Sequence, residues 1–460
     1  MKSKLIACAA LAALSGPVHA LGTGSLPADV TVFISGAAGL VANFDAVLGI
    51  PPTGLTPGTQ VCQTDTTTKF VDPVSGTNMI AWFCTASQAT GLGGRKILIY
   101  FRGSGGSPFG IDPVGQTPIG FYTIGAACPA TAGKVTNVCA GWNNKAQGYV
   151  ETKPEAGFSL MEPRLYLSPS SNIPPAESCA NSMFTDPCPP GFGTPGVQSS
   201  RSILVQATMI AVNQSLHDKL MVMQKLTGNQ VPSLTKAEVR SIFTEGNILS
   251  NGAEPPNWSN LSDALVLRGF TGMPFDGQMT ICRGINGLGT AAAFNATMLN
   301  APCATGAPQG ALTFISTSVP TVAPPLPLQR DLTVDIRQAV GQVLTCIRNA
   351  PTPAMGMLTL DQLGALGTNV FYVNIDGHPM INATTIDNAA IQFGLYDMWT
   401  ETKLQIGFNA TGNKLALLQA FQKALQESTP GPGVYNVQGL GESKPMYVTR
   451  GGNSCAPPQY

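Results

Sequence analysis

The sequence predicts an α/β fold, in which alternating strands and helices build a sheet that the helices cover. Three apolar segments rich in β-branched and aromatic residues have the character of buried strands. Three others carry apolar residues at helical spacing. Hydrophobic residues make up 43% of the chain, which is sufficient for a core and excludes a disordered protein. The strand candidates are residues 29–40, 96–107 and 202–213, and the helix candidates are residues 216–226, 235–243 and 413–426.

The first two strands each run into a turn of small residues. Residues 35–39 read SGAAG, and a possible helix, LVANFDAVL, follows them. Residues 103–107 read GSGGS. In α/β folds, ligands bind at the carboxyl ends of the strands, where turns of this kind expose backbone N–H groups. The two turns are therefore candidate parts of one binding site.

The helix candidates carry their own local signals. Thr235 and Glu238 have the spacing of a capping box at the start of the second helix. In the third, Leu415, Leu418 and Phe421 share one face, which predicts packing against the sheet. By contrast, Asp397 and Glu401 are expected to face solvent at helical spacing. Long loops rich in proline are expected at residues 171–196 and 319–328.

The first 20 residues have the pattern of a secretory signal peptide. Lys2 and Lys4 precede a short apolar run, and the segment ends in Val18-His19-Ala20. Cys8 comes too early in the apolar run for a lipoprotein acceptor. The apolar run is too short to span a bilayer, and no later segment could anchor the chain. We expect an exported protein of about 440 residues, periplasmic or secreted.

The charge balance excludes some partners. Removal of Lys2 and Lys4 leaves 23 basic and 25 acidic residues, a net charge of about −2. Such a chain has no basic field for nucleic acid and no polybasic membrane patch. We therefore expect neither nucleic acid nor a membrane span.

Ten cysteines remain after the signal peptide, and in an exported protein an even number predicts disulfides. A metal site is not expected, because there is no C-x-x-C and only His217 and His378 remain. Sequence alone does not fix the connectivity of ten cysteines. Short separations favour the pairs Cys62–Cys84, Cys128–Cys139, Cys179–Cys188 and Cys282–Cys303, which leaves Cys346 with Cys455.

A third candidate loop lies between two of these cysteines. Arg283 precedes the stretch GINGLG, and Thr290 then begins a helix-favouring run, AAAF. The N-terminus of a helix offers unpaired N–H groups and a partial positive charge. Thr290 is suited to be the N-cap, and Arg283 can bind an oxyanion with two parallel hydrogen bonds. The alternative is a structural turn with a surface arginine.

The order of these segments resembles the phosphate-binding protein family of bacterial phosphate ABC importers, which are two-lobed periplasmic binding proteins. The resemblance covers most of the mature chain. It is carried by SGAAG (35–39), GSGGS (103–107), FSLMEPRLY (158–166), LTKAEVRSIFTEG (234–246), NWSNL (257–261), CRGINGLGTAAAF (282–294) and FYVNIDGHPMINATTIDNAA (371–390).

The resemblance implies a two-lobed α/β fold with a small oxyanion, such as inorganic phosphate, bound in the cleft between the lobes. The cysteines and proline-rich loops, which are not typical of the family, predict disulfide-bonded loop insertions in that fold. It further implies an ABC permease as partner, with no catalysis, no metal and no cofactor. Lobe 1 would be residues 21–211 with 389–460, lobe 2 residues 212–388, and the hinge would lie near Asn213 and Asn388. The ligand-binding residues would be Arg283, Gly289 and Thr290, the backbone of Ala38 and Gly39, Ser104 with Ser107 as its rival, and Glu162 as the carboxylate.

The chain departs from the family pattern in the binding loops. Ala38 replaces a threonine, and Leu288 replaces a serine, so that two hydroxyl groups are lost. Arg283 lies one residue further from its loop than in the pattern. Because each hydroxyl-to-anion bond contributes about 1.5–3 kcal/mol, affinity would be lower. A second hypothesis is therefore a secreted structural or surface-interaction protein with a degenerate anion site.

A serine hydrolase is not expected from this sequence. The segment GSGGSP around Ser104 lacks a nucleophile elbow in helical register, because Pro108 follows Ser107 directly. His217 and His378 are the only histidines that could serve as a base, and both are expected to be structural or surface residues. Asp376-Gly377 is predicted to be a hairpin turn rather than a metal site.

Overall fold

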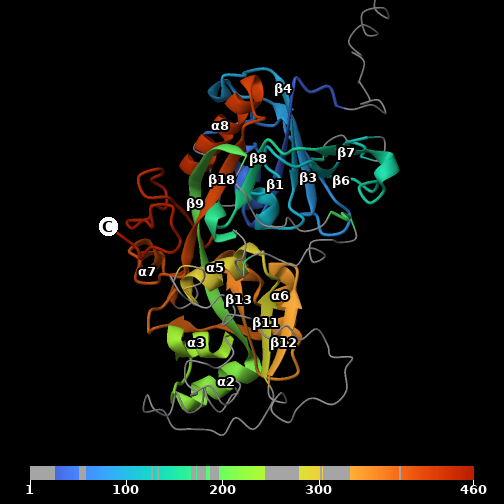
Figure 1. The fold of residues 1–460 in the computed structure, drawn as a ribbon. Helices are drawn as coiled ribbons and strands as arrows, with labels where there is room; N and C mark the ends of the chain where they lie inside the picture. The colour runs from blue at the N-terminus through green and yellow to red at the C-terminus, as the bar shows by residue number, and fades with distance from the viewer. Residues whose placement is uncertain are drawn as a thin grey trace, which may run out of the picture.

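The chain folds into a mixed α/β structure with two lobes, one above the other in Figure 1. The computed structural model describes residues 26–50, 59–125, 128–131, 134–166, 172, 183–186, 196–243, 279–300, 303, 332–382 and 385–460. The predicted signal peptide, the loop at 319–328, residues 257–261 and most of the loop at 171–196 lie outside these ranges.

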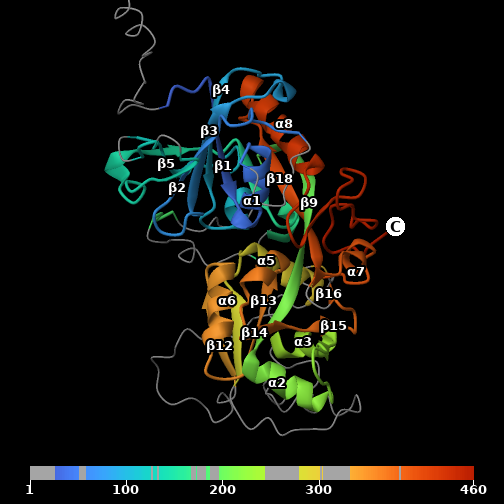
Figure 2. The same cartoon turned by 180° about the vertical axis from the view of Figure 1, so that it is seen from behind.

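One 13-stranded sheet connects both lobes, in the order β12-β11-β13-β9-β18-β8-β1-β4-β3-β2-β6, with β14 and β19 also paired to β9. Its long strand β9 (Val197–Asn213) pairs with β18 (Trp399–Gly407) and then with β13 (Ala354–Thr359). Figures 1 and 2 show β9 running from one lobe into the other. The lobes are therefore joined by continuous sheet and not by a loop alone.

Lobe 1 holds the N-terminal strands and is covered by α8 (Gly412–Glu427) and the short α1 (Val41–Val47). Strand β1 pairs in parallel with β4 and β8, so the turns after β1 and β4 lie at the same edge. The strands of this lobe are β1 (Val30–Gly36), β2 (Thr68–Val71), β3 (Met79–Thr85), β4 (Lys96–Arg102), β6 (Thr136–Val138) and β8 (Ala156–Ser159), with a hairpin of β5 (Ile119–Tyr122) and β7 (Tyr149–Thr152).

Lobe 2 places parallel strands between helices. Strand β11 (Met279–Gly284) pairs in parallel with β12 (Leu332–Arg337) and with β13. Helix α6 (Val340–Asn349) packs on β11, β12 and β13, and α5 (Gly289–Thr297) packs on β11 and β13. The remaining α-helices and strands of the described residues are α2 (Gln214–Met223), α3 (Lys236–Phe243), β14 (Val370–Tyr372), β10 (Ser233–Leu234), β15 (Asn374–Ile375), β16 (Ile381–Asn382), β17 (Thr385–Ile386), α7 (Asn388–Gln392) and β19 (Val434–Asn436). Of these, β19 pairs with β9 in the part of the sheet that also contains β18.

The α/β prediction and its six elements are confirmed. The three predicted strands correspond to β1, β4 and part of β9, and the three predicted helices to α2, α3 and α8. The capping box is present: the Thr235 N–H donates to Glu238 over 2.7 Å, and the Glu238 N–H donates to the Thr235 hydroxyl over 3.1 Å. The hairpin at Asp376-Gly377 is also confirmed, with φ of 53° and 78°. The proposed lobe boundaries remain predictions.

One expectation in this region is wrong. Glu401 does not face solvent on a helix, because it lies on strand β18 and is 3% exposed. Its carboxylate accepts hydrogen bonds from Ser202 on β9 and from Thr449 and Arg450 in the C-terminal segment. The spacing of Asp397 and Glu401 is compatible with a helix, but the pairing of β18 with β9 and β8 decides the local structure.

Four disulfides are present among the described residues. Cys62–Cys84 and Cys128–Cys139 agree with the prediction. The other two do not: Cys282 pairs with Cys346, and Cys303 pairs with Cys455. Cys282 lies on β11 and Cys346 on α6, which packs against β11, so proximity in space overrides proximity in sequence. The predicted pair Cys179–Cys188 lies outside the described residues.

Candidate functional site

The turns after β1 and β4 lie next to each other. A Cβ built on Gly103 would be 3.0 Å from the Cβ of Ala38. Gly39 lies near the side chain of Gln206 on β9. This proximity follows from the parallel pairing of β1 with β4, which brings their carboxyl ends to one edge. Two of the three predicted anion loops are thus adjacent.

The third loop meets the second across the lobe junction. A Cβ built on Gly106 would lie 3.7 Å from the carbonyl oxygen of Gly287. A Cβ built on Gly289 would lie 2.6 Å from the hydroxyl oxygen of Ser107 and 2.5 Å from a methyl group of Leu160. Residues far apart in the sequence therefore converge, and the glycine at 289 permits the close approach of the lobes.

This close approach gives a direct test of the lobe contact. Gly289→Ala places a methyl group against Leu160 and Ser107, and overpacking of this kind costs about 1–3 kcal/mol of unfolding free energy. Gly341→Ala is the matched control, because Gly341 is also near a helix start but has nothing within 4 Å of its built Cβ. Urea denaturation should show destabilisation for the first variant and none for the second. Equal stability of the two variants would contradict the packing at Gly289.

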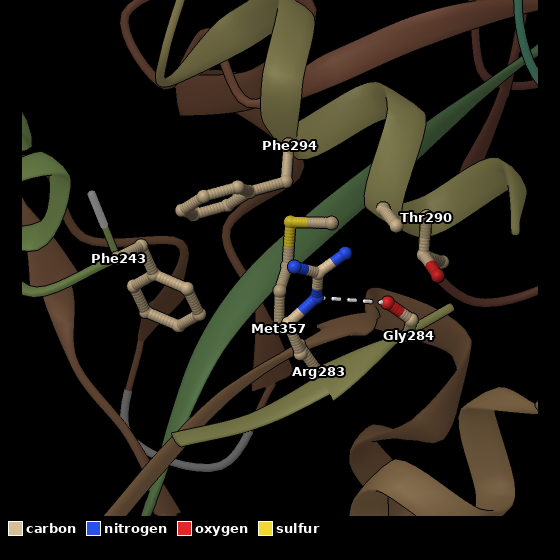
Figure 3. Close-up of a pocket in the computed structure, with 7 residues that line it drawn as sticks. Phe243, Arg283, Gly284, Thr290, Phe294 and Met357 are labelled. Atoms are coloured by element: carbon tan, nitrogen blue, oxygen red, sulfur yellow. Dashed lines mark hydrogen bonds between the residues drawn. The ribbon is translucent and has the colours of Figure 1, made fainter. Parts of the chain in front are cut away.

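Arg283 and Thr290 line one pocket at the top of lobe 2. Its other described lining residues are Phe243, Gly284, Ala291, Phe294 and Met357. The pocket contains about 290 Å³ free of protein atoms, a figure that includes open solvent at its mouth. Figure 3 shows the guanidinium group of Arg283 between Phe294 and Thr290. The pocket thus combines a cation with largely apolar walls.

The side chain of Arg283 is held by its own loop. Its Nε donates to the carbonyl oxygen of Gly284 over 3.1 Å, and its Nη2 donates to the side chain of Asn286. It is 6% exposed, and burial lowers its pKa to about 9. The group is still a cation at neutral pH. A buried cation in a weakly solvated pocket attracts an anion more strongly than one on the surface.

Thr290 occupies a different helix position from the predicted one. Helix α5 begins at Gly289, and its N-cap is Leu288, so Thr290 is the second residue of the helix rather than the N-cap. Its side chain is 3% exposed and lies in the pocket. The N–H groups of the first helical turn have no partner within the helix, which makes this terminus suitable for an anion.

The two rival serines have different surroundings. The backbone N–H of Ser104 donates to Asn78 over 3.2 Å, within lobe 1. The hydroxyl oxygen of Ser107 accepts a hydrogen bond from the Leu160 N–H over 3.1 Å and lies near Gly289 of lobe 2. Of the two, Ser107 is the residue at the lobe junction. It packs there beside Leu160 rather than in the described wall of the Arg283 pocket.

Glu162 binds the C-terminal segment. One carboxylate oxygen accepts from the Ser454 N–H over 2.8 Å and from Arg164 over 3.3 Å. The other accepts from the Ser454 hydroxyl over 2.6 Å. Glu162 is not among the described residues that line the Arg283 pocket. The structure therefore brings Arg283 and Thr290 together in one pocket, places Gly289 against Leu160 and Ser107, and leaves the predicted carboxylate outside the described wall of the pocket.

An apolar cluster fills the space between the lobes. Leu160, Met161 and Tyr166 of lobe 1 pack with Ala292 and Ala296 on helix α5. The sequence analysis assigns a role only to Glu162 in this segment and predicts no packing role for Leu160 and Met161. The signal was present in the sequence, since Leu160-Met161 and the alanine run of α5 are apolar and lie directly beside the expected ligand residues Glu162 and Thr290.

No protein-family model matches this sequence, and no match to it was found among curated proteins. Solved structures give only distant similarity. An ABC-type phosphate transport receptor from Vibrio cholerae is 12% identical with a TM-score of 0.31, over 63% of this chain and 82% of that one. PstS from Borrelia burgdorferi is 10% identical with a TM-score of 0.29, over 63% and 80%.

A third similar structure is a putative phosphate ABC transporter substrate-binding protein with bound phosphate from Clostridium perfringens. It is 14% identical with a TM-score of 0.28, over 50% of this chain and 65% of that one. Because all these TM-scores are below 0.5, the superpositions carry no weight for ligand or mechanism. The mixed α/β fold follows from the strand order itself.

Two further findings concern sites and membranes. Within the described ranges, no group of three or more His, Cys, Asp or Glu side chains is arranged to hold a metal ion. Of the helices in those ranges, none combines the length and apolar character that crossing a bilayer requires.

Proposed function

We propose that this protein is an exported solute-binding protein that captures phosphate or a related small oxyanion at the junction of its lobes. The observation that carries the proposal is the shared pocket of Arg283, Thr290 and the start of helix α5. Arg283 would supply charge and paired hydrogen bonds, and α5 would supply backbone N–H groups. The four disulfides fit the periplasm or the exterior of a cell, which are oxidising compartments.

The proposed mechanism needs no catalysis and no cofactor. The described wall of the Arg283 pocket belongs to lobe 2. An anion held there by Arg283 would favour the closed state of the lobes if it also reached the neighbouring Gly103–Ser107 turn of lobe 1. Delivery to an ABC permease belongs to the same proposal. Support for a contribution from both lobes comes from the closeness of Gly106 to Gly287 and of Ser107 to Gly289.

Isothermal titration of the purified full chain with phosphate tests the proposal. We expect saturable heat at sub-millimolar concentration, and Arg283→Ala should weaken binding by about 30-fold or more, because it removes the buried partner of the anion. Arg337→Ala is the matched control, since Arg337 lies on the neighbouring strand β12 but pairs with Asp335 and is exposed. The control should bind like the wild type.

The same titration with sulfate and arsenate covers related anions. No heat and no thermal shift with any of the three would exclude oxyanion capture. The second hypothesis, a structural or surface-interaction protein, would then be favoured. The observation on its side is the apolar cluster between the lobes, in which Leu160 and Met161 pack with the alanines of α5.

A further inference from the structure

The C-terminal segment crosses the junction of the lobes. We define residues 449–456 as the C-terminal strap. In Figure 1 the red C-terminal segment lies beside this junction, near α7. The start of the strap is bound to β18, where the Glu401 carboxylate accepts from the Thr449 hydroxyl and the Arg450 N–H, each over 2.9 Å. The guanidinium of Arg450 lies 4.6 Å from the ring of Trp399, which fixes the start of the strap on the sheet.

Two hydrogen bonds join the strap to lobe 1. The Ser454 N–H and the Ser454 hydroxyl both donate to Glu162, over 2.8 and 2.6 Å. Glu162 is 6% exposed and Ser454 is 2% exposed, so these bonds are shielded from water. Arg164 adds a contact to Asn453. A buried carboxylate bound by two donors holds its partner more firmly than a surface pair does.

A covalent bond joins the next strap residue to lobe 2. Cys455 forms a disulfide with Cys303, which follows helix α5. The helix itself packs on strands β11 and β13 of lobe 2. The path from Glu162 in lobe 1 to Cys303 in lobe 2 therefore passes through only Ser454 and Cys455.

The surfaces beneath the strap also hold the lobes together. Cys303 and Cys455 pack against the apolar cluster of Leu160, Met161 and the α5 alanines. On the same helix, the Asn295 side chain donates to Asn172 over 2.7 Å, and Asn172 donates to the carbonyl of Leu165 over 2.9 Å. Three kinds of contact, covalent, polar and apolar, thus act between the same two surfaces.

We propose that the C-terminal strap is a disulfide-anchored lock that keeps the two lobes closed on each other. The lock acts without ligand, because each of its contacts is made by the chain itself. It goes beyond the proposed function and does not depend on it. In a protein that binds solute by lobe closure, such a lock would shift the equilibrium towards the closed state.

Amide hydrogen exchange on the full oxidised chain, without added anion, tests the lock. In a Cys303→Ser, Cys455→Ser double variant, exchange of α5 and of residues 160–166 should accelerate by about tenfold or more, because local opening becomes easier. Small-angle scattering should show a larger radius of gyration. The matched control is Cys62→Ser with Cys84→Ser, which removes a disulfide confined to lobe 1.

The control should leave exchange in α5 and residues 160–166 as in the wild type. Unchanged exchange in the double variant, or equal acceleration in the control, would overturn the proposal. Ser454→Ala is a second, separate variant that retains every cysteine. It tests the lock even if the disulfide variant does not fold. It should accelerate exchange at residues 160–166, and a wild-type rate there would equally contradict the lock. Neither result depends on whether phosphate binds.

Discussion

Asp186→Ala should lower the unfolding free energy by about 3 kcal/mol or more, because it leaves a buried cation without its counter-ion. Asp186 accepts from Nη1 of Arg102 over 2.8 Å, and the same nitrogen donates to the carbonyl of Gly120 over 3.0 Å. Arg102 is fully buried, with its guanidinium 3.9 Å from the Phe184 ring and 4.5 Å from the Phe109 ring. Burial lowers the pKa of Arg102, and the nearby Asp186 counteracts this.

The comparison that isolates this pair is Arg102→Met combined with Asp186→Ala. An apolar side chain of similar volume between the two phenylalanine rings should restore most of the lost stability, as apolar replacement of buried ion pairs often does. Chemical denaturation of the three proteins gives the measurement. Stability of the single variant within 1 kcal/mol of the wild type would mean that the pair is not required. Arg102 directly precedes the Gly103–Ser107 turn, so the pair also fixes one candidate anion loop.

Glu401→Gln should be comparably destabilising, by about 3 kcal/mol, because it removes the negative charge that pairs directly with the buried Lys403 and leaves only the charge of Glu162. Lys403 is 5% exposed, and its ammonium lies 3.6 Å from the Glu401 carboxylate and 2.5 Å from the Ser202 hydroxyl. Burial by itself raises the pKa of Glu401. Hydrogen bonds from Ser202, Arg450 and Thr449 and the charge of Lys403 outweigh it, so that the pKa falls below 4.5.

The lowered pKa of Glu401 also sets a pH dependence. A carboxyl group with a pKa lower in the folded state than in the unfolded state stabilises the fold above the unfolded value of about 4.5. That stabilisation is lost as the pH falls through the folded pKa. Glu401→Gln should therefore lose stability at neutral pH and differ less from the wild type at acid pH. If the stability difference between Glu401→Gln and the wild type were the same at neutral and at acid pH, this role of the carboxylate would be excluded. Denaturation curves at several pH values provide the test.

Local sequence signals predicted the elements but not the connections between them. The capping box of α3 depends on Thr235 and Glu238, three residues apart, and is therefore readable in the sequence. The Cys303–Cys455 disulfide joins residues 152 positions apart and becomes visible only when α5 lies beneath the strap. The same holds for Arg102, whose partner Asp186 lies in a segment expected to be a loop.

The candidate site also has parts that local sequence signals predict and parts that depend on contacts between distant segments. The proximity of Arg283 and Thr290 could be predicted because a single short segment carries the strand end, the glycine loop and the helix start. The carboxylate role of Glu162 was read from its order in the chain. In the structure, Ser454 donates a hydrogen bond to each carboxylate oxygen of Glu162. The two residues are 292 positions apart in the sequence, so local patterns do not predict this contact. The pocket walls of Phe243 and Met357 also come from separate elements.

The sequence by itself determined the α/β class, the strand-to-turn transitions and the anion-suited start of α5, because these depend on residues within a few positions of each other. The tertiary structure alone decided which cysteines pair, where Glu162 and Glu401 find their donors, and that apolar side chains and the strap contact both lobes at their junction. These contacts join distant segments, and their free energy arises only when packing removes the groups from water.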